Sequence, residues 1–206
     1  IRDSLNWMQD NTSREGRILI EDSESDTGHQ FYGAHFPALF PEYVQREYLC
    51  GPRPLYPIKH SYASFTSGVL FEKEVNDYSL QELMQMFDLY NVKWIICWSQ
   101  ESRDLFNRYP DYLVPVQEID SFTIYQVRRT PSFFLKGAGS VQADYNRLEL
   151  SQVIPHNSEI VISYHWMQGL ATEPPRTLER VFIGDDPIGF IRILDPPRSL
   201  VIVNRY

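Results

Sequence analysis

A near-continuous apolar run, VKWIICWS, occupies residues 92–99, and few folds can accommodate it. A helical pattern precedes the run: residues 79–82 (SLQE) have the spacing of a capping box, and one apolar face extends to Tyr90. An unbroken apolar run of this length is typical of a strand that is covered on both faces, as in a parallel sheet between helices. The pattern therefore predicts an α/β layer with residues 92–99 as a buried strand.

Strand and helix patterns alternate around this run. RILIED at residues 17–22 and FTIYQV at residues 122–127 predict two further strands, and Ser99 is placed to cap a helix that Pro110 ends. This alternation of strand and helix patterns indicates helices packed on a sheet. Residues 1–130 are therefore predicted to form an α/β domain, a short and mostly parallel sheet with helices.

The character of the chain changes after RRTPS, residues 128–132. Residues 133–206 contain no convincing helical pattern. Short strand patterns recur there, separated by turn signals such as Pro174-Pro175 and Pro196-Pro197. Residues 131–206 are therefore predicted to form an antiparallel β-sandwich domain, jelly-roll-like.

Charge and motifs exclude several classes of function. The formal net charge of -8 argues against nucleic acid, which requires a basic face, and against a polybasic membrane anchor. No apolar run approaches the roughly 20 residues that span a bilayer. GAGS at residues 137–140 precedes a strand pattern and not a helix, so it is not a phosphate cradle. No cofactor is predicted.

The Pro-rich segment from residue 31 to 62 is the favoured place for a ligand, because loops on a rigid layer commonly carry binding groups. His29 and His35 lack the close spacing of zinc ligands, so a polar pocket for an anionic or sugar ligand is expected instead. The candidate ligand-binding side chains in or beside this segment are His29, His35, Arg46, Arg53, Lys59 and His60.

A second candidate lies in SEIVISYHWMQGL, residues 158–170. His165 beside Trp166 suggests a sugar platform, but alternation assigns Trp166 to the apolar face together with Ile160 and Ile162. Packing is therefore favoured for Trp166, and a one-residue bulge would reverse the assignment. His165 points to the opposite face and is kept as a candidate ligand-binding residue.

Acidic pairs and cysteines complete the candidates. Asp185 and Asp186 could bind Ca²⁺, but two acids supply few of the about six to eight oxygens it takes, so a solvated turn is favoured. Glu21-Asp22 at a strand end could serve glycoside chemistry, and such acids are as often caps. Cys50 and Cys97 lie among apolar neighbours, which favours buried thiols over a disulfide.

Several stretches together resemble one group of proteins. They are LNWMQDNTSREGRILIEDS (residues 5–23), REYLCGPRPLYPIKHSYASF (46–65), LYNVKWIICWS (89–99), SFTIYQV (121–127) and GDDPIGFIRILDPP (184–197). These stretches are similar to the part that follows the last membrane helix in bacterial membrane glycosyltransferases of the C type and their relatives. Some of those relatives are labelled as related to pyruvoyl-tetrahydropterin synthase.

The resemblance implies a soluble extracytoplasmic domain, tethered to the membrane through an absent N-terminal part. The start at Ile1, inside a helical pattern, fits an excised domain. The residues that transfer sugar in such proteins lie mainly in the membrane part, so this chain would not be catalytic alone. It would bind or scaffold, with a glycan or a lipid-linked sugar as partner. The tryptophan-rich motif of oligosaccharyltransferases is not present, which puts that activity in doubt.

Two alternatives stay open. A carbohydrate-binding or carbohydrate-active protein would expose a row of aromatic rings, for example Tyr145, Trp166 and Tyr206. A structural or partner-binding domain would instead show an apolar patch and no concave polar site near His29, His35 and His60.

Overall fold

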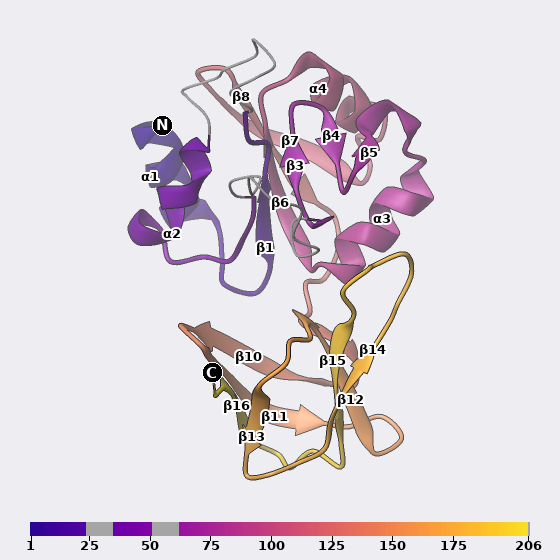
Figure 1. The fold of residues 1–206 in the computed structure, drawn as a ribbon. Coiled ribbons are helices and arrows are strands. Elements are labelled where there is room, and N and C mark those ends of the chain that lie inside the picture. Colours follow the sequence, from indigo (N-terminus) through magenta and orange to yellow (C-terminus); the bar gives the residue numbers. More distant parts are fainter. Residues whose placement is uncertain (24–34, 51–61, 206) are drawn as a thin grey trace. The chain divides into compact units, whose positions relative to one another are not determined.

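A computed structural model describes residues 1–23, 35–50 and 62–205. The chain divides into two compact units, Ile1–Pro131 and Ser132–Tyr206, which are described one at a time (Figure 1). It is mostly β, with several antiparallel sheets and few helices. No helix in the described ranges combines the length and the apolar character needed to cross a membrane.

The first unit is built on a five-stranded sheet of order β2-β1-β6-β8-β7. Its strands are β1 (Arg17–Ile20), β2 (Tyr48–Leu49), β6 (Val92–Cys97), β7 (Leu113–Ile119) and β8 (Phe122–Val127). A small antiparallel sheet is formed by β3 (Phe65–Thr66), β4 (Val69–Leu70) and β5 (Lys73–Glu74). The helices are α1 (Arg2–Asn11), α2 (Phe40–Tyr43), α3 (Leu80–Leu89) and α4 (Gln100–Asn107), with the 3-10 turns η1 (Phe36–Leu39) and η3 (Val75–Asp77).

The five-stranded sheet is mixed, so the prediction of a mostly parallel sheet is wrong. β1 pairs in parallel with β2 and with β6, whereas β6–β8 and β8–β7 are antiparallel. β7 and β8 form a hairpin, whose turn places Asp120 in the left-handed region at φ 54°. β7 escaped prediction because it contains Pro115 and is largely exposed, both of which an edge strand tolerates.

Helices cover both faces of this sheet. α1 and α2 lie on one face, and α3 and α4 lie on the other (Figure 1). The α1–α2 face buries one apolar cluster, formed by Met8, Ile18, Ile20, Phe40, Val44, Trp94, Ile96, Phe122 and Ile124. On β6 only Lys93 is not buried, which confirms the prediction of a strand covered on both faces.

Side-chain caps fix the starts of α3 and α4 as the sequence predicts. The Ser79 hydroxyl accepts a hydrogen bond from the Glu82 amide at 3.3 Å, and the Glu82 carboxylate accepts from the Ser79 amide at 2.8 Å. Lys73 binds the same carboxylate at 2.7 Å. Ser99 caps α4 by accepting from the Ser102 amide at 3.2 Å.

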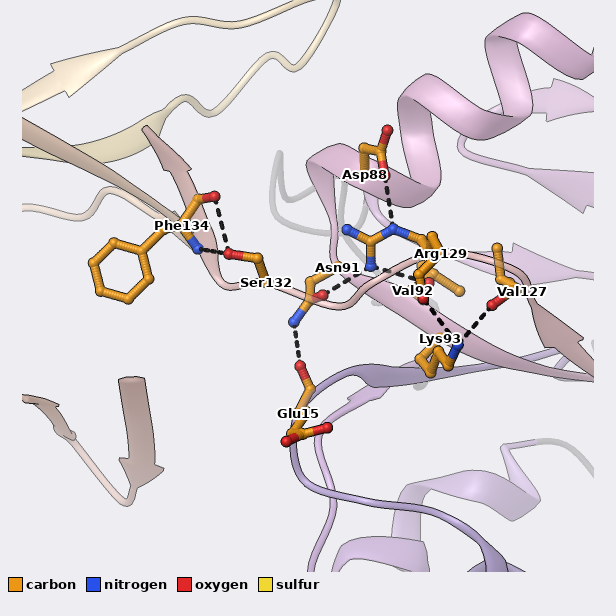
Figure 2. A network of polar contacts seen from close by, with 9 residues as sticks. All are labelled: Glu15, Asp88, Asn91, Val92, Lys93, Val127, Arg129, Ser132 and Phe134. Atoms are coloured by element: carbon orange, nitrogen blue, oxygen red, sulfur yellow. Dashed lines mark hydrogen bonds and ion pairs between the residues drawn. The ribbon is translucent and has the colours of Figure 1, made fainter. Parts of the chain in front are cut away.

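A polar network fastens the amino ends of β1 and β6 (Figure 2). The Arg129 guanidinium donates to Asp88 at 2.7 Å and to the Asn91 side chain at 2.9 Å. Asn91 in turn donates to the carbonyl of Glu15 at 2.8 Å, and Lys93 donates to the carbonyl of Arg129 at 2.9 Å. Burial lowers the pKa of Lys93, and the charge of Arg129 lowers it further. These side chains therefore serve structure at the end of the strands opposite Glu21.

The second unit consists of two four-stranded antiparallel sheets, of order β10-β11-β16-β13 and β14-β15-β12-β9. Their strands are β9 (Phe134–Lys136), β10 (Ala138–Asp144), β11 (Arg147–Ile154), β12 (Glu159–His165), β13 (Leu170–Glu173), β14 (Leu178–Val181), β15 (Phe190–Leu194) and β16 (Leu200–Asn204). Both sheets contribute to one apolar cluster, formed by Phe134, Leu150, Val153, Ile160, Ile162, Ile191, Ile193, Leu200 and Ile202.

The face assignment within residues 158–170 is confirmed. Ile160 and Ile162 are in the core, and Trp166 is partly buried against the same cluster. The pairing with β15 shifts register between Ile162 and His165, yet Trp166 still packs inward. Trp166 is therefore a packing residue and not an open sugar platform.

Candidate functional site

The parallel strands β1 and β6 define the place in the first unit where a ligand site is expected. β1 lies between its parallel neighbours β2 and β6. In sheets of this kind the connections diverge at such a point, which leaves a crevice at the carboxyl ends of the strands. The residues at those ends are Glu21-Asp22-Ser23 after β1 and Trp98-Ser99 after β6.

Glu21 is fully buried there and joins three segments of the chain. One carboxylate oxygen accepts from the Gly68 amide at 2.8 Å and from the hydroxyls of Ser99 and Ser102 at 2.6 and 2.9 Å. The other accepts from the amides of Trp98 and Ser99, both at 2.9 Å. All its acceptor capacity is used, and its charge lies at the amino end of α4, where the helix dipole favours it. Glu21 is therefore a structural anchor.

Asp22 is also buried, with an exposed fraction of 1%, but it contacts a side chain that reaches solvent. One carboxylate oxygen accepts from the Ser23 amide at 2.8 Å, and the other lies 2.9 Å from His35 Nδ1. The Asp22 backbone is held as well, because its amide donates to the carbonyl of Phe65 at 2.8 Å and its carbonyl accepts from the Ser67 amide at 3.3 Å.

His35 carries the solvent-facing part of this pair. Its side chain is 35% exposed, and Nε2 makes no hydrogen bond to a described residue. The residue has a left-handed backbone at φ 61° and ψ 29°, directly before η1. That conformation costs an ordinary residue roughly 1 kcal/mol, and such residues concentrate at functional sites. His35 is therefore the predicted ligand-binding residue that the fold brings to the ends of the strands.

The nearby thiol is not a nucleophile. Burial, together with a smaller contribution from the charge of Asp22, raises the pKa of Cys50 to about 12. Burial also raises the pKa of Cys97 well above its ordinary value, with a smaller contribution from Glu21. Both cysteines are free, and both remain protonated near neutral pH.

Arg46, another predicted ligand-binding residue, makes hydrogen bonds to the end of α1. Its guanidinium donates to the carbonyl and the hydroxyl of Thr12, at 2.9 and 3.1 Å, and to the carbonyl of Gln9 at 3.3 Å. The Gln9 carbonyl belongs to the last turn of α1 and Thr12 is its C-cap, a helix end that basic side chains commonly cap. Of the other predicted binding residues, His29, Arg53, Lys59 and His60 lie outside the described residues.

His165 and Asp186 form a separate pair in the second unit. His165 Nε2 lies 2.9 Å from one Asp186 oxygen, and the other oxygen accepts from the amides of Ile188 and Gly189 at 2.8 and 2.6 Å. The Asp186 side chain is fully buried, so it organises the turn from inside, whereas Asp185 is exposed. Asp186 is therefore not the solvated turn residue that was expected, and its carboxylate is not open to Ca²⁺.

Within the described ranges, no group of three or more His, Cys, Asp or Glu side chains is arranged so that it could hold a metal ion. The predicted aromatic row is not assembled either. Tyr145 is almost fully exposed and Trp166 packs inward, while Tyr206 lies outside the described residues.

The Asp22–His35 contact was not apparent from sequence, although both residues had been singled out. The available signal was the position of the acids directly after a buried strand, which indicates the carboxyl edge of a sheet. Comparison with known proteins adds no further evidence: no protein-family model, no curated protein and no solved structure matches the chain.

Proposed function

We propose that this chain is an accessory binding domain that holds a hydroxyl-rich ligand, a glycan or a lipid-linked sugar, at the carboxyl ends of β1 and β6. The observation that carries the proposal is the Asp22–His35 pair, in which a buried carboxylate contacts a histidine that is 35% exposed. Convergent polar groups at the carboxyl ends of parallel strands, where their connections diverge, are a common basis of small-ligand sites.

The charge at the site favours a neutral ligand over an anion. Glu21 and Asp22 place two carboxylates at the strand ends. The predicted cation Arg46 is committed to α1. A phosphate or carboxylate would therefore approach two buried negative charges, whereas sugar hydroxyls would meet only hydrogen-bonding groups. The ring of Trp98, whose indole N–H donates to the Glu21 carbonyl at 3.1 Å, supplies apolar surface at the same strand ends.

The same two carboxylates support a role without catalysis by this chain alone. Glycoside hydrolysis uses two carboxyl groups that flank the bond to be cleaved, one of them as proton donor. Glu21 and Asp22 are at most 1% exposed, and the oxygens of both accept hydrogen bonds from within the protein. A sugar at the surface could not reach either carboxylate without local unfolding.

We further propose that the domain belongs to a membrane glycosyltransferase-like protein and lies on the extracytoplasmic side, tethered through a preceding membrane part. The sequence resemblance of residues 5–23, 46–65 and 89–99 supports this proposal. In the second unit, two four-stranded antiparallel sheets around one core fit a jelly-roll-like sandwich, which we propose as its class.

A binding and turnover experiment on residues 1–206 tests the proposal. Methyl glycosides of common hexoses and a short lipid-linked sugar are titrated while heat release and product formation are followed. We expect saturable binding that His35→Ala weakens, and no hydrolysis or transfer. Turnover by this chain would contradict the accessory role, and absence of binding by every probe would contradict the binding role.

A second candidate is carbohydrate binding by the second unit. Phe182 is 59% exposed, and the Arg180 guanidinium lies 4.5 Å from its ring centre and 5.7 Å from that of Trp166. This arrangement offers one open ring beside a cation. If Phe182→Ala abolishes saccharide binding and His35→Ala does not, this second candidate replaces the first.

A further inference from the structure

We propose that Asp22 is a positioning residue that holds neutral His35 in the tautomer with its proton on Nδ1, so that Nε2 is presented as a hydrogen-bond acceptor. The inference deepens the proposed function and rests on it for the nature of the ligand. It makes the site selective for groups that donate a hydrogen bond, which hydroxyls do, over groups that only accept one, such as carboxylates.

The first step is the fixed orientation of the Asp22 carboxylate. The Ser23 amide donates to Oδ1 at 2.8 Å, so only Oδ2 is directed at His35. The Asp22 backbone cannot rotate freely, because it bonds to Phe65 of β3 and to Ser67 in the turn that follows β3. The residue is 1% exposed, so water does not compete for the carboxylate.

The second step is the position of the proton on the ring. His35 Nδ1 lies 2.9 Å from Asp22 Oδ2, which is hydrogen-bonding distance. An ionised carboxylate has no proton to give, so the ring supplies it from Nδ1. In the neutral ring Nε2 then carries a lone pair, and the hydrogen bond made by one nitrogen determines the role of the other.

The third step is access to Nε2. The His35 side chain is 35% exposed, and Nε2 bonds to no described residue. The left-handed backbone at φ 61° sets the direction from which the side chain leaves the chain. The lone pair is therefore available to a ligand hydroxyl. The reverse tautomer would present an N–H donor at Nε2 in place of the lone pair and would favour an anion.

A second histidine serves as a reference within the same chain, because it contacts its carboxylate partner through the other ring nitrogen. His165 contacts Asp186 through Nε2, at 2.9 Å, and not through Nδ1. The same reasoning assigns His165 the Nε2–H tautomer. One spectrum of the intact chain can therefore display both tautomers, with His165 as the control for His35.

Long-range proton–nitrogen NMR spectra of the full chain with nitrogen-15 histidine test the inference. They are recorded above the titration midpoint of each ring, and His35→Gln assigns the His35 signals. We expect Nδ1–H for His35 and Nε2–H for His165. A wild-type His35 ring with its proton on Nε2 would overturn the inference, whatever the variants do.

Asp22→Asn is the matching variant. The side-chain oxygen of the variant should keep the hydrogen bond from the Ser23 amide, so the new NH₂ group faces His35 Nδ1. Because this NH₂ group donates, Nδ1 must accept, and the ring proton should move to Nε2. Asp186→Asn is the control that should leave His35 unchanged. In the Asp22 variant we expect affinity for a methyl glycoside to fall at least about fivefold, because the hydroxyl that donates to Nε2 in the wild type loses this acceptor and would have to turn to accept from Nε2–H. Retention of the wild-type tautomer or affinity in a folded Asp22 variant would contradict the role of Asp22.

The two proposals fail separately. If no methyl glycoside binds the wild-type chain but His35 is the Nδ1–H tautomer, the glycan proposal fails and the positioning role of Asp22 stands. If a glycoside binds and His35 carries its proton on Nε2, the binding role stands and the positioning role fails.

Discussion

Glu21 shows how much of the first unit depends on one buried side chain. Its carboxylate receives hydrogen bonds from Gly68, in the turn between β3 and β4, and from Trp98, Ser99 and Ser102 around the start of α4. A buried charge is tolerated only when its hydrogen-bonding capacity is satisfied. Here the satisfied carboxylate ties β1 to both segments and keeps the neighbouring Asp22 in place for His35.

The substitution Glu21→Gln should destabilise the chain strongly. A glutamine replaces one acceptor oxygen with an NH₂ group, and in either orientation at least two donors lose their acceptor. We expect the free energy of unfolding to fall by about 3 kcal/mol, measured by urea denaturation. Glu101→Gln, at an exposed position of α4, is the control and should change it by less than about 0.5 kcal/mol. An equally small effect at Glu21 would show that the carboxylate is not an anchor.

The helix α3 begins with a capping box whose strength depends on pH. The Lys73 ammonium, together with the amide and hydroxyl of Ser79, lowers the pKa of Glu82 from 4.5 to about 2. Because the pKa is lower in the folded state, the stabilisation is complete above pH 4.5. It is lost as the pH falls from there toward about 2.

The lowered pKa of Glu82 predicts how the stability of Glu82→Gln should depend on pH. The variant should be less stable than the wild type near neutral pH, and the difference should shrink as the pH falls from 4.5 to about 2. Thermal unfolding of both proteins over this range measures the difference, and carbon-13 NMR of the Glu82 carboxyl group gives its pKa directly. A pKa near 4.5, or a difference independent of pH, would contradict the role of the capping box.

The elements show which patterns a sequence can reveal. The capping box and β6 were predictable because local spacing and an unbroken apolar run depend on nearby residues. The direction of β8 was not, because strand pairing is decided by the hairpin with β7, and β7 lacks an alternating apolar pattern. The contact of Asp22 with His35 was also hidden, since it depends on a left-handed turn that composition does not signal.

The two compact units of the chain have separate apolar clusters. One lies between the five-stranded sheet and the α1–α2 face, and the other is shared by the two four-stranded sheets. The change of pattern near residue 130 was visible in the sequence because helical periodicity stops there. The pairing order within the second unit was not visible, because its short strands are alike and pair over long separations.

Because each unit has its own apolar cluster, we expect a cavity in one cluster to destabilise that unit and not the other. Ile162→Ala in β12 should lower the stability of the second unit by about 3 kcal/mol, since it opens a cavity at a fully buried site. Hydrogen exchange should accelerate at amides of β12 and β15 and remain unchanged at β1 and β6. Ile154→Ala, at an exposed position of β11, is the control. Equal acceleration in both units would show that the chain unfolds as one cooperative body.

The assignment of function to the first unit is tested by amide NMR of the full chain during titration with methyl glycosides. We expect saturable shift changes at Asp22, Ser23, His35, Trp98 and Ser99, with Asp22→Asn reducing them. No change at these residues, or changes confined to His165, Trp166 and Phe182, would contradict a ligand site at the carboxyl ends of β1 and β6.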